Sequence, residues 1–307
     1  MSNRELYAFI QENDVPISLA TRALSVSRAS YYRHINHVPT PTEKRRDEVR
    51  AQLHVAYANS KGRYGAPKLT AAINKQRTDH VSQKYIQKLM HEEGLYSIIQ
   101  RKWRASSAAN PVAERHNLMD QDFSTTTINQ KWAGDITYIH TQKDGWTYLC
   151  TFMDLYSRRI VGYAYGPDMT VNLVLNAFGN AISNRDVYDG LIVQTDLGSQ
   201  FISAEFERQL TYVGATHSYS HKGTPYDNAM IESFHATFKK EEYYVNKHHY
   251  PSLIIARRHV FEYIEHWYNR VRIHGRLGMK SPVEFEATRS AVDGLCNNAS
   301  ATECPAK

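Results

Sequence analysis

The chain has 307 residues, with 37 Lys and Arg, 31 Asp and Glu, and 3 Cys. This length is enough for about two domains, and 42% hydrophobic beside 22% charged residues excludes an intrinsically disordered chain. No apolar stretch could span a bilayer, and residues 1–10 lack an export signal, so we expect a cytoplasmic protein. Cys150, Cys296 and Cys304 form no CxxC pair, which argues against a structural zinc site.

Positive charge is concentrated toward the N-terminus. Residues 1–110 carry 18 Lys and Arg against 9 Asp and Glu, whereas residues 111–307 carry 19 against 22. A basic arm attached to a slightly acidic remainder is typical of proteins that bind polyanions. The sequence therefore predicts nucleic-acid binding, with a solvated basic surface as the alternative.

Residues 1–40 are predicted to form a first helix-turn-helix-like segment. Two short helices are expected over residues 18–24 and 28–35, and the second has the size of a helix that can lie in a major groove. An ordinary pair of packed helices is the alternative. The expected core consists of Ala20, Leu24, Val26, Tyr31 and Ile35. The candidate DNA contacts are Arg28, Tyr32 and Arg33. Residues 38–42, with two prolines, are predicted as a linker.

Residues 43–96 are predicted to form a second helix-turn-helix-like domain. A charged helix over residues 43–58 is followed by the turn Tyr64-Gly65-Ala66-Pro67 and a short helix over 68–74. Ser82 can cap a last helix that ends at Gly94, with Val81, Tyr85, Leu89 and Met90 on its apolar side. The basic side of that helix offers two candidate DNA contacts, Lys84 and Lys88.

Residues 97–128 are predicted as a basic and then polar connector. Positive charge beside one aromatic residue suits contact with phosphate, and a tethering linker is the alternative. The candidate DNA contacts in this connector are Arg101, Lys102 and Arg104.

Residues 129–290 change to a pattern of alternating strands and helices. Strands are expected over residues 131–141, 146–154, 159–165, 191–195 and 216–220, and helices over 170–182, 203–213, 227–241 and 252–269. The order β-β-β-α-β-α-β-α-α predicts an α/β fold with a mixed sheet. The small, polar residues 291–307 are predicted as a disordered tail.

Three carboxylates stand out in this region. Asp135 lies within the first strand, and Asp196 ends a buried strand, where ligand-facing groups of α/β sheets gather. The helix over 227–241 has an apolar side formed by Ile231, Phe234 and Phe238. Its polar stripe consists of Asn228, Glu232, His235 and Lys239. Asp227 is predicted only to cap this helix.

Converging carboxylates are the ligands that Mg²⁺ prefers, and two such ions ~3.5–4 Å apart support phosphoryl transfer. We therefore expect Asp135 to bridge two ions, with Asp196 and Glu232 each completing one site. Mn²⁺ is a possible substitute. Lys239 is placed to hold a DNA phosphate or base, and Asn228 projects toward the same place as a further candidate DNA contact.

The spacing of these carboxylates resembles the Asp-Asp-Glu (DDE) core of transposases and retroviral integrases, which has an RNase H-like fold. The sequence motifs around these carboxylates are closer to those of the second-reading-frame protein of the insertion-sequence-three family of bacterial transposons. They are Trp132-Ala133-Gly134-Asp135-Ile136-Thr137-Tyr138-Ile139, Thr195-Asp196-Leu197-Gly198-Ser199-Gln200-Phe201, and the run from Gly223 to Phe234. The closing motif Tyr268-Asn269, Arg272, His274, Leu277-Gly278 and Ser281-Pro282 also matches, with Gly275 in place of the usual Ser. The Tyr64 to Leu69 segment and residues 81–95 resemble the family's helix-turn-helix before the core.

This resemblance implies metal-dependent cleavage and joining of double-stranded DNA at transposon ends and in target DNA, without a covalent enzyme–DNA intermediate. Symmetric pairing of two ends favours a homo-oligomer on DNA, within the bacterial nucleoid. In this family an upstream reading frame often supplies, by frameshift fusion, a further helix-turn-helix and a leucine zipper. No heptad pattern follows Met1, so the sequence leaves open whether this chain acts alone or as the catalytic part of such a fusion.

Two other functions compete with a DDE recombinase. A non-catalytic regulator that binds element ends shares the basic arm, but it has no use for Asp135, Asp196 and Glu232 together with Lys239. A nuclease without strand transfer shares the metal site, but two helix-turn-helix candidates and the carboxylate spacing favour the recombinase. Fold alone does not separate these functions.

Overall fold

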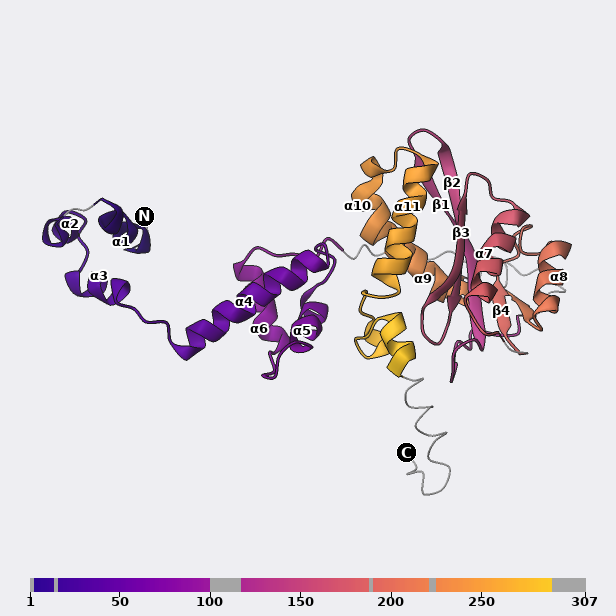
Figure 1. The fold of residues 1–307 in the computed structure, drawn as a ribbon, viewed down its shortest axis with the longest axis horizontal. Coiled ribbons are helices and arrows are strands. Elements are labelled where there is room, and N and C mark those ends of the chain that lie inside the picture. Colours follow the sequence, from indigo (N-terminus) through magenta and orange to yellow (C-terminus); the bar gives the residue numbers. More distant parts are fainter. Residues whose placement is uncertain (1–2, 14–15, 100–116, 188–189, 221–224, 289–307) are drawn as a thin grey trace, which may run out of the picture.

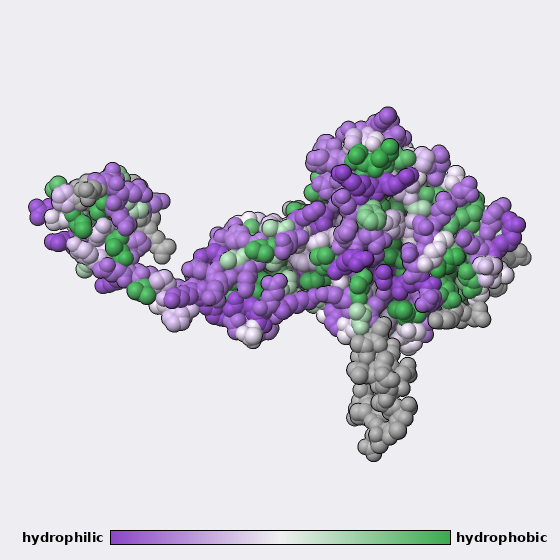
Figure 2. Space-filling model, viewed as in Figure 1, coloured by the Kyte–Doolittle hydropathy of each residue, from purple (hydrophilic) through white to green (hydrophobic). Residues whose placement is uncertain are grey.

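The computed structural model describes residues 3–13, 16–99, 117–187, 190–220 and 225–288 (Figure 1). Arg101, Lys102 and Arg104 lie outside the described residues, as does the predicted tail over 291–307. Among the helices of the described ranges, none combines the length and apolarity needed to cross a bilayer. Figure 2 shows a largely hydrophilic visible surface over the N-terminal half, broken by small hydrophobic patches.

The N-terminal bundle has three helices, α1 (Asn3–Glu12), α2 (Ile17–Ala23) and α3 (Arg28–Ile35). Helix α1 was not predicted, and it supplies two of the four buried residues of this core. The four are Tyr7, Ile10, Ala20 and Tyr31. Leu24 and Val26 pack against this core as predicted, but the prediction for Ile35 was wrong, because its side chain is 37% exposed. The expected pair of helices is thus completed by a third.

The second helical domain contains α4 (Pro41–Asn59), α5 (Ala66–Asn74) and α6 (Gln83–Glu92). Thr40 and Glu43 form a capping box, so the residues Pro41 and Thr42 begin the helix rather than belong to a linker. Ser82 caps α6, and Gly94 follows it with a φ of +65°, as the sequence predicts. The apolar side of α6 also includes Ile86, which is fully buried.

The remaining residues form a five-stranded sheet with the order β3-β2-β1-β4-β5. Its strands are β1 (Lys131–Thr141), β2 (Gly145–Asp154), β3 (Ile160–Gly166), β4 (Ile192–Thr195) and β5 (Thr216–Tyr219). The first three strands are antiparallel, whereas β4 runs parallel to both β1 and β5. This arrangement confirms the predicted mixed sheet of an RNase H-like integrase core.

Helices cover both faces of the sheet. Helices α7 (Val171–Ser183) and α8 (Ala204–Tyr212) lie on one side, and α9 (Ala229–Phe238), α10 (Tyr244–Asn246) and α11 (Leu253–Phe261) on the other (Figure 1). Alternate residues of β1 enter different cores, Trp132 toward α7 and Ala133 toward α9, because successive side chains of a strand point to opposite faces.

Two of the predicted helices are divided by changes of helical type. The expected helix over 227–241 consists of a 3₁₀ turn (Pro225–Asn228), α9 and a π-helical turn (Lys239–Tyr243). The expected helix over 252–269 continues from α11 into a second π-helical segment (Glu262–Tyr268). Such π-helical turns are frequent at functional sites.

The second helical domain packs against the sheet-containing half of the chain through its Arg63-Tyr64 turn. The Tyr64 hydroxyl accepts from the Ile273 amide at 2.9 Å and donates to the Val271 carbonyl at 3.0 Å. Arg63 is buried and forms an ion pair with buried Glu242, with 2.7 Å between Nη2 and Oε2. A single hydrophobic cluster joins α4–α6 to β1, α9 and α11. The turn therefore fixes the domain as well as starting α5.

Candidate active site

The sheet register brings the two aspartates together. Strand β4 pairs with β1 so that Ala133 lies beside Gln194, and two further residues along each strand lead to Asp135 and Asp196. Neighbouring strands are ~4.8 Å apart, and residues two positions apart point to the same face. Asp135 and Asp196 are therefore neighbours at the edge where β4 ends, on the side of the sheet that α9 covers.

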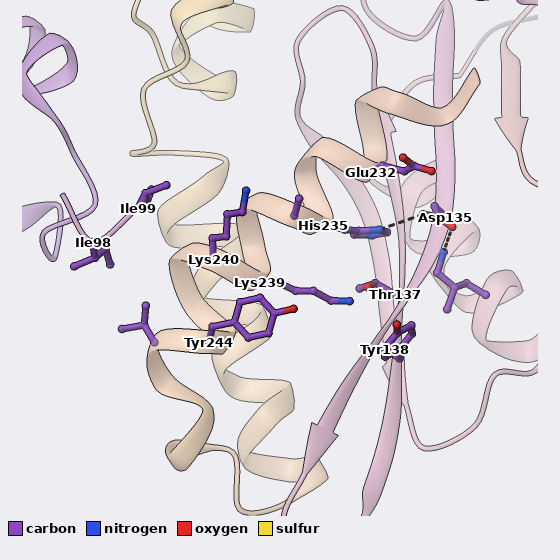
Figure 3. A pocket seen from close by; sticks show the side chains of 13 residues that line it. Ile98, Ile99, Asp135, Thr137, Tyr138, Glu232, His235, Lys239, Lys240 and Tyr244 are labelled. Carbon is purple, nitrogen blue, oxygen red and sulfur yellow. Dashed lines mark hydrogen bonds and ion pairs between the residues drawn. The ribbon is translucent and has the colours of Figure 1, made fainter. Parts of the chain in front are cut away.

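Helix α9 holds Asp135 through a histidine. His235 Nδ1 lies 3.2 Å from Asp135 Oδ2 (Figure 3). His235 Nε2 lies 2.8 Å from the Thr151 hydroxyl. With Nδ1–H facing the carboxylate, Nε2 can accept from Thr151. The other oxygen of Asp135 accepts from the Ile136 amide at 2.8 Å. Asp135 is thus oriented from both its own strand and the helix.

Gly134, the residue before Asp135, allows β1 to pack closely against a buried aromatic ring. A Cβ atom at Gly134 would lie 2.4 Å from Cε1 of Phe152, which is closer than any real contact. The Phe152 ring is fully buried against α7 and α8. The glycine lets the strand approach this ring, so that the next residue faces α9.

Glu232 and Lys239 flank Asp135 along α9. Glu232 precedes His235 by one helical turn, and Lys239 follows it by another. All of them line one groove of about 1020 Å³, which Ile98 and Tyr244 close from the other side (Figure 3). Lys239 Nζ lies 4.3 Å from the centre of the Tyr138 ring, so its charge is directed along the groove.

Burial and like charges at this site change the pKa values of its ionisable groups. Desolvation by the surrounding protein and the negative charge of Asp135 both raise the pKa values of Asp196 and Glu232. Burial raises the pKa of the Cys150 thiol well above its usual range, and the charges of Asp135 and Asp196 add to this shift. Burial lowers the pKa of Lys239. In the described parts of the chain, neither Asp196 nor Glu232 has a basic ion-pair partner.

The Asp196 carboxylate is held in a turn of its own. Its Oδ1 accepts from the Gly198 amide at 3.0 Å. The preceding residue, Thr195, donates to the Asp196 carbonyl and lies 2.8 Å from His217 Nε2. Within the described ranges, no group of three or more His, Cys, Asp or Glu side chains is arranged so that it could hold a metal ion. Asp135, Asp196 and Glu232 therefore do not form a metal-binding arrangement in this structure.

The structure brings three of the residues expected from sequence, Asp135, Glu232 and Lys239, into one groove. The fourth, Asp196, lies beside Asp135 but does not line that groove. Sequence reasoning missed the role of His235, although its position one turn from Glu232 was the available signal. Its side chain is only 6% exposed, because it lies between the helix and β2.

Two neighbouring predictions need correction. Asp227 does not cap the helix, because it is buried and accepts from Asn117 Nδ2 at 2.9 Å and from Gln121 Nε2 at 3.2 Å. Asn228 is 5% exposed and its Nδ2 donates to the Gly134 carbonyl at 3.4 Å. This placement connects the start of α9 to β1 and argues against the predicted contact of Asn228 with DNA.

The other predicted DNA contacts lie on the helical domains. Arg28, Tyr32 and Arg33 are all exposed on α3. Lys84 and Lys88 are exposed one turn apart on α6, on the side opposite Ile86 and Met90. These five side chains are accessible to a partner, but they are not part of the groove beside Asp135.

Family models match both halves of the chain. Two models described as integrase core domains match residues 126–225 and 213–282. A model described as an HTH-like domain matches residues 44–103, which contain α4, α5 and α6.

Curated relatives match nearly from end to end. The chain is 38% identical over 253 residues to the transposase for insertion sequence element IS904 of Lactococcus lactis subsp. lactis strain IL1403, covering 82% of this chain and 98% of the relative. It is 36% identical over 285 residues to transposase InsF for insertion sequence IS3A of Escherichia coli strain K12, covering 91% and 98%.

Solved structures with a related arrangement include retroviral proteins. One is the HTLV-2 integrase catalytic core domain in complex with magnesium, at 20% identity and a TM-score of 0.39, covering 52% of this chain and 96% of that one. Another is the catalytic core domain of BIV integrase, at 17% identity and a TM-score of 0.40, covering 54% and 98%.

Proposed function

Because the chain belongs to the insertion-sequence-three family of transposases, we propose that Asp135, Asp196 and Glu232 are its catalytic residues for cleaving and joining DNA strands. The observation that carries this assignment is the β1–β4 register, which makes the two aspartates neighbours, together with the His235 contact, which fixes α9 and hence Glu232 beside them. Asp135 of β1 and Glu232 of α9 line one groove, and Asp196, directly after β4, lies beside Asp135.

The donor chemistry of these residues suits a divalent cation. Asp196 and Glu232 lack basic ion-pair partners within the described ranges, and burial and then the charge of Asp135 raise their pKa values. Oxygen ligands of this kind suit Mg²⁺, and Mn²⁺ accepts the same ligands. We assign Asp135, Asp196 and Glu232 as the ligands. When bound, such ions supply activation of an attacking oxygen and stabilisation of a leaving one.

The remaining residues orient the reactants. His235 and the Ile136 amide fix the direction of the Asp135 carboxylate. Lys239 directs positive charge into the groove, where it can contact a DNA phosphate. In the reaction, an oxygen of water or of a DNA 3′-OH forms a bond to phosphorus while the bond from phosphorus to the leaving 3′ oxygen breaks. The leaving oxygen takes up a proton, and no covalent bond to the enzyme forms.

For DNA recognition we divide the chain into modules. Residues 1–40 and 43–96 would contact the element end, the first through Arg28, Tyr32 and Arg33 of α3 and the second through Lys84 and Lys88 of α6. Residues 97–128 connect them to the catalytic core over residues 129–290. The enzyme would act as a homo-oligomer on nucleoid DNA, alone or fused to an upstream helix-turn-helix segment, since two element ends must be joined in one complex.

The test is a cleavage and strand-joining assay on the DNA that flanks the gene, with Mg²⁺ or Mn²⁺, and with or without the upstream reading frame. We expect joined products that disappear in Asp135→Asn, Asp196→Asn and Glu232→Gln, while DNA binding persists. The exposed acids Asp168 and Glu205 provide matched controls as Asp168→Asn and Glu205→Gln. Undiminished joining by any of the three active-site variants would remove that residue from the proposed site. End binding without any product would favour a regulator.

A further inference from the structure

A second pocket lies on the opposite side of α9 from Glu232. It has a volume of about 300 Å³, and it is lined on α9 by Ser233 and Thr237. We call it the basic pocket. Its basic and imidazole side chains are Lys68, Arg158, Arg272, His274 and Arg276. Residues 232 and 239 face the catalytic groove, whereas 233 and 237 are about 100–160° further round the helix.

The basic pocket draws its cations from three separate parts of the chain. Lys68 comes from α5 of the second helical domain, Arg158 from the turn between β2 and β3, and Arg276 from the 3₁₀ turn Gly275–Leu277. The Arg63-Tyr64 contacts that fix the domain therefore also bring Lys68 to the core. Lys68 joins the other cations of the pocket only because the two domains pack together.

Most of this positive charge has no counter-charge. Arg272 is paired with buried Glu241, with 2.9 Å between Nη2 and Oε1. Among the residues that the structure describes, Lys68, Arg158 and Arg276 have no ion-pair partner, and Lys68 has only the ring of Tyr64 at 5.3 Å. One carboxylate thus faces four cations, so the pocket is complementary to an anion.

The ionisation of the lining groups reports the same imbalance. Burial and the neighbouring charge of Arg272 lower the pKa of Lys68 to about 8. Burial and then the charges of Arg272, Lys68 and Arg158 lower the pKa of His274 to about 2, which leaves the imidazole neutral. Burial also lowers the pKa of Arg158, and Arg276 adds to this effect. Each group is less easily charged first because it is buried and then because positive neighbours lie close by.

The turn that carries Arg158 adopts a costly backbone conformation. Arg158 has a φ of +61°, in the left-handed region that disfavours a residue with a side chain. The Asp154 side chain accepts from the amides of Tyr156 and Ser157 and so fixes the turn. The Arg158 amide donates to the Asp154 carbonyl at 2.9 Å. Strain of this kind persists where the surrounding structure determines it and is concentrated at ligand sites.

We propose that the basic pocket binds a backbone phosphate of DNA, and that this phosphate is held by both the second helical domain and the catalytic core. The argument rests on the proposed function, which makes DNA the polyanion that this enzyme handles. Arginine forks and hydroxyl groups are the donors that recognise phosphate oxygens, and the pocket offers both. Exposed Arg276 and Ser233 keep it open to a strand running along the surface.

The first test measures the binding of element-end DNA to the full chain as a function of salt. Arg276→Gln, Lys68→Gln and Arg158→Gln should each weaken binding about three- to tenfold and lower the slope of log affinity against log salt by about one. Arg208→Gln is the matched control, because Arg208 is an exposed arginine of α8. Arg276 is exposed, so its substitution does not threaten folding. An unchanged affinity and slope for Arg276→Gln and Lys68→Gln would overturn the proposal.

The second test locates the phosphate. Methylphosphonate is placed at one backbone position at a time, which removes the charge of a single phosphate. For the unaltered chain, methylphosphonate at one position should weaken DNA binding about tenfold. In the Arg276→Gln variant, methylphosphonate at that same position should leave DNA binding unchanged. Arg208→Gln should leave the profile as it was. A profile in which no position couples to Arg276 would overturn the proposal.

A free phosphate compound is the other source of the same chemistry. Inorganic phosphate and pyrophosphate are therefore titrated as competitors and followed by the protection of Lys68 from amine modification. Protection by millimolar phosphate without methylphosphonate coupling would assign the pocket to a small anion and reject DNA.

The proposal and the proposed function can fail separately. Coupling between one methylphosphonate position and Arg276, in a chain that joins no DNA, would retain the phosphate site and reject the proposed catalytic function. DNA joining without this coupling would retain the catalytic function and reject the phosphate site.

Discussion

The two sides of α9 differ in the sign of the charge that they collect. Toward β1 and β4, burial and then the charge of Asp135 raise the pKa values of Asp196 and Glu232. Toward α5, Lys68 and Arg158 lie among further cations that disfavour their charged forms. The helix itself is ~10 Å wide, so opposite charges that would neutralise each other are kept apart by a layer of buried Ile231, Phe234 and Phe238.

This separation has an energetic consequence. A like-charged cluster destabilises the folded chain unless a ligand of opposite charge occupies it. The acidic side therefore indicates a cation and the basic side a phosphate. Charge removal should harm function on either side and, in the absence of ligands, should stabilise the fold.

The largest expected effect is on the acidic side. Asp135→Asn, Asp196→Asn or Glu232→Gln should lower cleavage and joining by about 10³-fold or more, because each removes a ligand of the proposed ions. The measurement is the single-turnover rate on element-end DNA, with binding followed in parallel. Asp168→Asn should retain the rate. A loss of binding equal to the loss of rate would instead indicate a general defect of the DNA complex.

Separating the second helical domain from the sheet-containing half should disrupt the basic pocket while leaving Asp135, Asp196 and Glu232 in place. Arg63→Met leaves Glu242 buried without its guanidinium partner, which costs about 3–5 kcal/mol. Arg45→Met, which breaks an exposed pair with Asp79, should cost under ~1 kcal/mol. Denaturant unfolding measures both. Equal effects of the two variants would show that the buried pair does not fix the domains.

Substitutions of His235 test whether activity and Mg²⁺ affinity depend on the orientation of the Asp135 carboxylate. His235→Ala should lower activity and apparent Mg²⁺ affinity about 10–100-fold, because groups that orient a metal ligand have effects of this size. His235→Gln retains hydrogen-bonding groups and should restore part of the affinity. The exposed His249→Ala is the control, and the readout is the Mg²⁺ concentration for half-maximal rate. A fall in rate with unaltered Mg²⁺ dependence would contradict the orienting role.

Mg²⁺ binding should offset the loss of folding stability caused by the ionised carboxylates Asp196 and Glu232. Mg²⁺ at tenfold its dissociation constant should stabilise the unaltered chain by about 1.4 kcal/mol. Asp196 and Glu232 have raised folded pKa values, so their ionisation opposes folding as pH rises through the acidic range. Asp196→Asn should therefore be more stable than the unaltered chain without Mg²⁺ and gain less from its addition. Thermal unfolding at neutral pH, with and without Mg²⁺, tests both statements.

The smallest expected effect concerns Lys68. Its folded pKa of about 8 is below the ordinary value of 10.5, so its charge destabilises the fold below pH 8 and this penalty disappears as pH rises toward 10.5. Lys68→Met should stabilise DNA-free protein by about 1 kcal/mol at pH 7 and flatten the rise in stability above pH 8. It should nevertheless weaken DNA binding. A destabilised Lys68→Met would show that packing outweighs the charge penalty.

Much of the fold could be predicted because its signals are local. Ser82 and Gly94 define the limits of α6 through cap chemistry alone. Alternation along β1 defines which residues face the core, and the carboxylate of Asp135 is conspicuous against that pattern. Helix α1 was missed because Tyr7 and Ile10 acquire meaning only when α2 and α3 are present to bury them.

The sequence by itself determined the strand and helix order of the sheet-containing half, the basic N-terminal part and the chemical identity of the candidate carboxylates. These follow from periodicity, charge and residue type, which are properties of neighbouring positions. Only the tertiary structure decided that His235 orients Asp135, that Asp227 is held by Asn117, and that Lys68 meets Arg158. Such contacts join residues far apart in the chain, and they depend on how buried side chains pack between elements.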